Sequence, residues 1–246
     1  VWARYFFSIP FLLPLLVARY SPRQILAYAS PLELLRGVSI VVVTVSYFGA
    51  IQYLPLADAL GLLFVYPLLA TGLAVAFLGE RVKTRVLGLS VFSFLGAVLI
   101  IKPGFSAFNI GSVLALVAAL AVSVNIVLSR KLSQTTPTLV AVFITSAVGL
   151  LAVAPIVPFF WVAPTSDQWW QLAILGAISA LFSWLIYAAM AKAPATILAP
   201  FGFSEIVAVT IFGYLFFGDL PDGFSVLGIA VIIVAGIGIA ASSEPD

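Results

Sequence analysis

Nine long apolar runs constrain the fold of this chain more than any other feature of its sequence. A helix needs about 20 mostly apolar residues to cross the hydrocarbon core of a bilayer, with a range of about 17–25. Polar, proline or glycine residues separate runs of this kind at about 2–19, 36–54, 58–78, 86–102, 110–129, 138–160, 169–191, 196–217 and 224–242. The runs are apolar on all sides and lack the short alternating pattern of membrane strands. The sequence therefore predicts an all-α integral membrane protein with nine visible transmembrane helices.

Composition supports this prediction and excludes several kinds of chemistry. Hydrophobic residues make up 63% of the chain, charged residues 8%, and the mean hydropathy is +1.24, whereas soluble domains carry about 25% charged residues. The surface must therefore face membrane lipid. The chain has no Cys and no His, which excludes disulfides, thiol catalysis and imidazole metal sites. We predict no metal, no cofactor and no nucleic-acid partner.

The basic residues indicate the orientation, because cytoplasmic loops of membrane proteins carry an excess of Lys and Arg. Of the eleven basic residues, Arg4 and Lys102 fall on one predicted side. The other nine fall on the opposite side, at Arg19, Arg23, Arg36, Arg81, Lys83, Arg85, Arg130, Lys131 and Lys192. We expect a multi-pass protein of the cell inner (plasma) membrane, with its C-terminus in the cytoplasm.

The chain also repeats itself at an offset of 139 residues. This shift places Pro55 on Pro194 and the pair Gly79-Glu80 on Gly218-Asp219. Five predicted spans separate the matched positions, so the two copies have opposite orientations, as in the inverted repeats of many transporters. We predict a first repeat half at 1–105 (helices 2–5 of an expected ten) and a second at 106–246 (helices 6–10). The helix at 110–129 has no counterpart in the first half, so a missing first helix is expected; a natural nine-helix protein is the alternative.

Several motifs, taken in order, resemble a known family. They are YLPLADAL at 53–60, YPLLATGLAVAFLGERV at 66–82, GAVLIIKPG at 96–104, LSRKL at 128–132 and FFGDLPD at 216–222. Together they resemble the EamA-type branch of the drug/metabolite transporter superfamily. The resemblance implies a ten-helix inverted-repeat bundle that carries small metabolites such as amino acids, riboflavin or S-adenosylmethionine. Arg4 resembles an arginine in the second helix of that family, whereas Glu205 lacks the proline that often follows the family's glutamate.

Glu205 is the main candidate functional residue, because it is the one carboxylate that the predicted spans place near mid-membrane. Charged side chains at that depth are costly and usually functional. We predict that Glu205 binds the solute or a proton, and the alternative is a fixed salt bridge with Arg4 as its charge partner. Asp58 lies near a predicted helix end, where simple solvation is the favoured interpretation.

Polar and aromatic residues near the axis of the repeat are further candidates for solute binding. The offset of 139 residues pairs Tyr66 with Glu205. Aromatic side chains could form a cage for a planar or cationic solute, and the candidates are Tyr47, Tyr66, Trp184 and Tyr187. Packing against helices or lipid is the alternative for each aromatic residue. Asn125 could line the path of the solute or join helices.

These features predict a secondary transporter that moves a small metabolite, resembling an amino acid or a vitamin or nucleoside, across the cytoplasmic membrane. Its two halves would rock in alternating access, with a proton or other ion as the candidate coupling species. A membrane scaffold or partner subunit without transport is one alternative. An intramembrane enzyme is the other, although the spans lack the paired carboxylates or metal ligands that hydrolysis requires. We therefore predict that the protein is not an enzyme.

Overall fold

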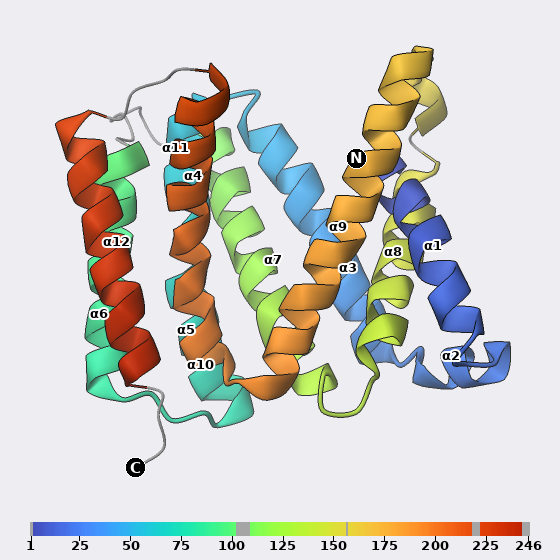
Figure 1. Ribbon diagram of the computed structural model, residues 1–246, viewed down its shortest axis with the longest axis horizontal. Helices are drawn as coiled ribbons and strands as arrows, with labels where there is room; N and C mark the ends of the chain where they lie inside the picture. The colour runs from blue at the N-terminus through green and yellow to red at the C-terminus, as the bar shows by residue number, and fades with distance from the viewer. Residues whose placement is uncertain (1, 102–108, 156, 218–221, 243–246) are drawn as a thin grey trace. The chain divides into compact units, whose positions relative to one another are not determined.

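The computed structural model describes residues 2–101, 109–155, 157–217 and 222–242. Within these ranges every regular element is a helix. The helices of the first part of the chain are α1 (Trp2–Val17), α2 (Pro22–Tyr28), α3 (Pro31–Ala50), α4 (Leu56–Leu63), α5 (Tyr66–Leu78) and α6 (Thr84–Ile101). They are followed by α7 (Ile110–Leu132), α8 (Thr138–Val153), η1 (Val157–Phe160), α9 (Ser166–Lys192), α10 (Ala195–Leu198), η2 (Ala199–Phe203), α11 (Ser204–Phe217) and α12 (Gly223–Ala241). The predicted all-helical class is confirmed (Figure 1).

Each predicted apolar run contains a helix, and seven helical segments of the described residues are long and apolar enough to cross a membrane. The apolar helices α1 and α8 have 16 residues each and are shorter than these seven. These features fit a helical membrane bundle. Nine crossings, a tenth helix and the inverted repeat stay predictions.

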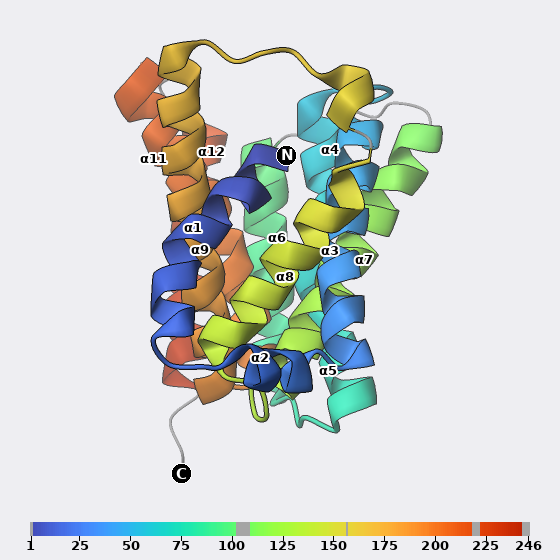
Figure 2. The same cartoon turned by 90° about the vertical axis from the view of Figure 1, so that its right-hand side faces the viewer.

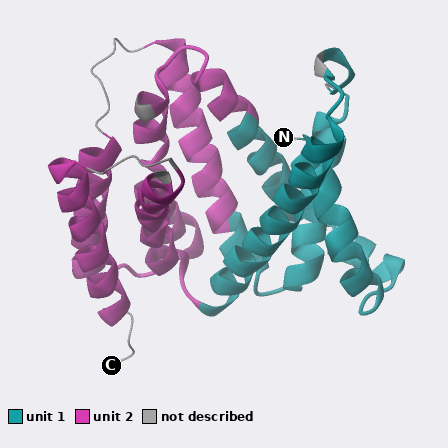
Figure 3. Ribbon diagram, turned by 45° about the horizontal axis from the view of Figure 1, so that its top comes forward, with its two compact units in different colours: residues 1–44, 128–192 teal, residues 45–127, 193–246 magenta. Residues whose placement is uncertain are grey.

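Contacts between residues divide the chain into two compact units, which Figure 3 colours separately. Unit 1 comprises residues 1–44 and 128–192, and unit 2 comprises residues 45–127 and 193–246. Each unit therefore contains segments of both predicted repeat halves. The units are defined by contacts and the halves by sequence, so the halves stay a prediction.

In unit 1, helix α1 packs against both α8 and α9 (Figure 2). The hydroxyl of Ser8 on α1 donates a hydrogen bond of 3.0 Å to the carbonyl of Gly176 on α9. The two backbones approach closely because Gly176 has no side chain and faces the backbone of Phe7. Near the C-terminal end of α1, buried Leu16 packs against α8. Small and hydroxyl residues of this kind commonly mediate helix contacts in membranes.

In unit 2, helices α6 and α12 lie side by side (Figure 1). Gly96 and Gly228 meet at their crossing, where a Cβ atom on Gly228 would lie 2.5 Å from the carbonyl oxygen of Gly96. The close contact allows van der Waals packing between the backbones, which is a principal source of helix association in lipid.

The predicted apolar runs at 58–78 and 196–217, both in unit 2, are each divided into more than one helical element. The run at 58–78 is divided into α4 and α5, where Pro67 in the first turn of α5 has no N–H for a continuous helix. The run at 196–217 is divided into α10, η2 and α11, with Pro200 near the start of η2. Phe64 and Phe203 stack at these breaks, with ring centroids 6.4 Å apart. A break in a helix leaves backbone N–H and C=O groups without the hydrogen-bond partners that a continuous helix would give them.

Candidate functional site

Glu205 lies in the first turn of α11, directly after the η2 segment. Its side chain is exposed, and its charge interacts electrostatically with the hydroxyls of Tyr47 and Tyr66. In the part of the chain that the structure describes, this carboxylate forms no hydrogen bond and no ion pair. Three of the predicted site residues thus belong to unit 2 and interact electrostatically, and the carboxylate has no hydrogen bond or ion pair among the described residues.

Tyr66 is held in place at both its backbone and its ring. The hydroxyl of Ser123 on α7 donates to the carbonyl oxygen of Tyr66 at 3.0 Å, which fixes the start of α5 against α7. The phenol hydroxyl of Tyr66 packs against Gly202 so closely that a Cβ atom there would overlap it. This arrangement places the phenol beside the segment that carries Glu205.

A cavity of about 290 Å³ adjoins Glu205. Apolar side chains from α4 and its C-cap, α6 and α11 form most of the described lining, which includes Leu56, Leu60, Phe64, Ile100, Ile101, Ile206 and Val209. Besides Glu205, the other described lining residue is Thr210, whose hydroxyl donates to the carbonyl of Ile206 at 2.8 Å. A mostly apolar pocket with few convergent polar groups is the usual form of a small-molecule site.

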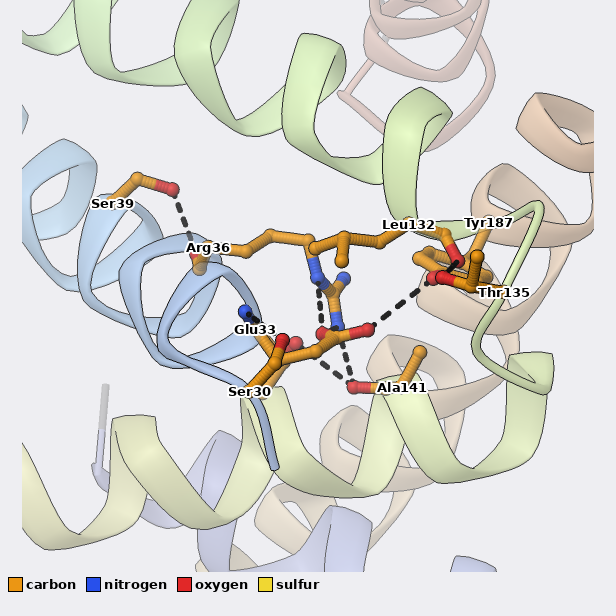
Figure 4. Close-up of polar contacts among 9 residues, drawn as sticks. Ser30, Glu33, Arg36, Ser39, Leu132, Thr135, Ala141 and Tyr187 are labelled. Atoms are coloured by element: carbon orange, nitrogen blue, oxygen red, sulfur yellow. Dashed lines mark hydrogen bonds and ion pairs between the residues drawn. The ribbon is translucent and has the colours of Figure 1, made fainter. Parts of the chain in front are cut away.

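Unit 1 contains a buried charged cluster that joins α3, α8 and α9 (Figure 4). Glu33 is 0% exposed and pairs with Arg36 across one helical turn, with an N–O distance of 2.8 Å. The Arg36 guanidinium also donates to the carbonyl of Ala141 on α8 at 2.6 Å. Its carbon Cζ lies 4.8 Å from the ring centroid of Tyr187 on α9, and the Tyr187 hydroxyl donates to Glu33 at 3.4 Å. We name Glu33, Arg36, Ala141 and Tyr187 the α3 charge cluster.

The structure corrects two sequence-based predictions, those for Arg36 and Asp58. Arg36 was expected in a cytoplasmic loop, but it lies inside α3 and is 4% exposed. Glu33 lies in the first turn of the candidate span Pro31–Ala50, so Glu205 as the one carboxylate near mid-membrane stays a prediction. The sequence did contain a signal, since opposite charges at positions i and i+3 of a helix can neutralise each other. Asp58, which was expected to be solvated, is also buried, at 6% exposed, and has an interaction partner.

The other predicted site residues lie in different surroundings. Tyr187 is buried in the α3 charge cluster, and Trp184 is 42% exposed on the same helix. Asn125 on α7 is half-buried and has an interaction partner. Arg4 donates to the hydroxyl of Tyr5 at 3.3 Å and lies 5.0 Å from its ring centroid. Arg4, Trp184 and Tyr187 belong to unit 1, so the four-residue cage and the pair of Arg4 with Glu205 stay predictions.

Comparison with known proteins identifies the family. The model of the EamA-like transporter family matches residues 109–241, which is more than half of the chain. The chain belongs to this family. The predicted resemblance to EamA-type transporters is therefore confirmed.

Relatives of this EamA-like transporter extend the match to most of the chain. It is 32% identical over 216 residues to the pseudopaline exporter of Pseudomonas aeruginosa (strain UCBPP-PA14), with 87% of this chain and 76% of the relative covered. It is 27% identical over 242 residues to the S-adenosylmethionine uptake transporter of Rickettsia bellii (strain RML369-C), with 98% of this chain and 82% of the relative covered. The relatives are named as transporters of small molecules, which together with the apolar helices supports a multi-pass small-molecule transporter. The family and the names of the relatives thus point to transporters, which are not enzymes.

A solved structure supports the fold independently. The crystal structure of another protein superimposes on the EamA-like transporter with a TM-score of 0.83, and the match covers 100% of this chain and 88% of the other. The sequence identity is 21%, so this likeness concerns the fold alone.

Proposed function

We propose that this protein is a secondary transporter that moves a small metabolite across the cytoplasmic membrane by alternating access, with Glu205 binding the solute. The observation that carries the proposal is the available carboxylate of Glu205 beside Tyr47 and Tyr66 in a family of transporters. Ionisable residues within membrane spans usually mark the path of a solute or an ion.

The broken helices support this location for the site. Transporters with inverted repeats bind solutes near the midplane, at discontinuous helices that occupy corresponding positions of the two halves. An offset of 139 residues relates Pro55 to Pro194, and these residues are the N-caps of α4 and α10. The same offset relates Phe64 to Phe203 at the two breaks. Tyr66 and Glu205, which follow the breaks, are related in the same way.

The solute that we propose resembles an amino acid, a vitamin or a nucleoside and carries an amine or another cationic group. A carboxylate that has no partner among the described residues favours such a group, and phenol rings add a cation–π attraction. The S-adenosylmethionine transported by one named relative combines a nucleoside with an amino acid and fits this description. A proton that binds to Glu205 when the solute leaves is the coupling species that we propose.

Uptake into liposomes that contain the purified protein tests the proposal. A panel of labelled metabolites, including S-adenosylmethionine, is supplied with and without an imposed pH gradient. We expect Glu205→Gln to abolish or uncouple uptake, because the amide keeps the shape of the side chain and loses its charge. Asp167→Asn is the matched control, since Asp167 also lies in the first turn of an apolar helix.

Three results would contradict the proposal. Normal uptake by a folded Glu205→Gln protein would remove this residue from the mechanism. Absence of uptake for every solute would instead favour a scaffold or partner subunit. If Glu205→Gln unfolds the protein and Arg4→Met restores the double variant, Glu205 is a structural partner of Arg4.

A further inference from the structure

The cavity beside Glu205 has a composition that selects one class of solute. We propose that the cavity binds the apolar arm of an organic cation whose positive head pairs with Glu205; this inference rests on the proposed function and specifies its substrate class. The ligand is amphipathic, with one cationic group and one aromatic or aliphatic arm, as in an arylalkylamine.

The charge of the head follows from the polar groups that line the cavity. Of the nine lining residues that the structure describes, Glu205 and Thr210 are polar. The hydroxyl proton of Thr210 is already donated to the carbonyl of Ile206, so the lining offers acceptors and no free donor. Among the residues that the structure describes, no basic side chain lines the cavity. A carboxylate or phosphate group of a ligand would therefore lie beside the like charge of Glu205 without a partner. An ammonium group of a ligand would instead form an ion pair with Glu205, which offsets the loss of water around the ammonium.

The apolar arm follows from the shape and position of the cavity. Leu60 comes from α4, Phe64 directly follows that helix, Ile101 ends α6, and Val209 comes from α11. The apolar lining thus combines the end of α6 with the first two turns of α11, which carry Glu205. A volume of about 290 Å³ accommodates a phenyl ring or a short aliphatic chain, and its apolar lining favours burial of such an arm by about 25 cal/mol per Å² of apolar surface. A small hydrophilic cation would leave this apolar space unfilled.

The phenols of Tyr47 and Tyr66 complete the recognition of the cation. The Tyr66 hydroxyl lies against Gly202, three residues before Glu205, and both phenols interact electrostatically with the charge of Glu205. Aromatic faces attract quaternary as well as primary ammonium groups. We therefore expect the methylated form of the same ligand to bind too.

Four related probes test the inference with the purified full chain in detergent. 2-Phenylethylamine has both the cation and the arm, and its N,N,N-trimethyl derivative has a permanent charge. 2-Phenylethanol has the arm without the charge, and ethylamine has the charge without the arm. We expect the two amphipathic cations to raise the unfolding temperature at concentrations at least about tenfold below those needed for either single-feature probe.

Three variants locate the binding site, and the unfolding temperature of each is measured with and without probes. Glu205→Gln should weaken binding of both cations by about tenfold or more, because one partner of the charge pair is lost. Val209→Trp should fill the cavity and weaken binding of 2-phenylethylamine to the level of ethylamine. Leu215→Trp adds the same ring to an exposed position of α11 outside the cavity and should bind normally. Val209 is 63% exposed, so its replacement should allow folding.

Equal stabilisation by 2-phenylethanol and 2-phenylethylamine would overturn the inference, as would normal binding by Val209→Trp. A lipid acyl chain is the competing occupant. If Val209→Trp loses co-purified lipid but keeps its affinity for the cation, the cavity is a lipid site and the inference is wrong. The proposed function is tested separately, because uptake of another metabolite through Glu205 would stand even if all four probes fail to bind.

Discussion

The guanidinium of Arg36 lies 4.8 Å from the ring centroid of Tyr187, although 151 residues separate the two in the chain. The hydroxyl of the same tyrosine donates to Glu33, the ion-pair partner of Arg36. Tyr187 therefore contacts both charges of a buried pair, one through its ring and the other through its hydroxyl. A buried ion pair gains net stability only when further polar contacts of this kind offset the desolvation of both charges.

The first prediction concerns this pair. Glu33→Gln should destabilise the protein by about 3–5 kcal/mol, because it leaves the charge of Arg36 buried without compensation. The double variant Glu33→Gln with Arg36→Met should recover most of that loss, since no buried charge remains. The midpoint of thermal unfolding in detergent measures both effects. Arg23→Gln on exposed α2 is the control and should change stability little. A double variant as unstable as Glu33→Gln alone would show that the charges do not act as a pair.

A second prediction concerns Glu80, which follows the αL glycine that ends α5. Its two carboxylate oxygens accept hydrogen bonds from the backbone N–H groups of Ala195 and Thr196, at 3.1 and 2.9 Å. Loss of a cap typically costs about 1 kcal/mol, so Glu80→Ala should destabilise unit 2 by about that amount and Glu80→Gln by less. Hydrogen exchange of the Ala195 and Thr196 amides should accelerate in Glu80→Ala. Unchanged exchange would contradict the role of Glu80 as a cap.

The crossing of α6 and α12 gives a third prediction. A methyl group at Gly228 would lie 2.5 Å from the carbonyl oxygen of Gly96 and 2.6 Å from Ile100 Cγ1. Gly228→Ala should therefore force the helices apart and cost about 1–3 kcal/mol, as overpacking commonly does. Gly88→Ala on α6 is the matched control, because no atom lies within 4 Å of its added methyl group. Equal unfolding temperatures for the two variants would mean that the crossing adjusts freely.

A fourth prediction tests the topology. The distribution of Lys and Arg places Gln134 in the cytoplasm and Ser166 outside. The correction at Arg36 removes one loop charge from the larger group and leaves eight residues against two. Single cysteines at these exposed positions can be labelled selectively, because the chain has no Cys. In intact cells an impermeant thiol reagent should label Ser166→Cys and spare Gln134→Cys. The reverse pattern would invert the predicted orientation, including the cytoplasmic C-terminus.

The positions of the helices were largely predictable from the sequence, because a bilayer requires long apolar segments whose backbone groups are satisfied internally. The breaks before Tyr66 and Ser204 were not predicted, since apolar residues continue through both and only Pro67 and Pro200 hint at them. The repeat offset relates Tyr66 to Glu205, which interact electrostatically, and their role in solute binding stays a prediction.

The α3 charge cluster was missed for a different physical reason. Hydropathy treats Glu33 and Arg36 as two polar residues that interrupt an apolar run, although together they form one neutral pair. Their burial depends on contacts with α8 and α9, more than 100 residues away in the chain. Tyr187 was assigned to an aromatic cage because local sequence does not reveal which long-range partner a tyrosine contacts.

The last prediction concerns Gly202 as a positioning residue for Tyr66. An added Cβ atom at Gly202 would overlap the hydroxyl of Tyr66 and lie 2.8 Å from its Cζ atom. Gly202→Ala should therefore displace the phenol from Glu205 and weaken binding of 2-phenylethylamine, with about a tenfold loss as the expected scale for a misplaced contact. Gly72→Ala on α5 has open space around its methyl group and serves as the control.

A double-variant cycle separates displacement of the ring from general loss of stability. Tyr66→Phe removes the hydroxyl that the methyl group would meet, so adding Gly202→Ala to Tyr66→Phe should cause much less further loss of affinity than it causes in the unchanged protein. Residues in direct contact typically show coupling of about 0.5–3 kcal/mol in such cycles. Unfolding temperatures of all four proteins are measured beside their affinities. If the two substitutions reduce affinity independently, Gly202 does not act through the Tyr66 hydroxyl. The loss of affinity in Gly202→Ala would then come from a change in the backbone of η2.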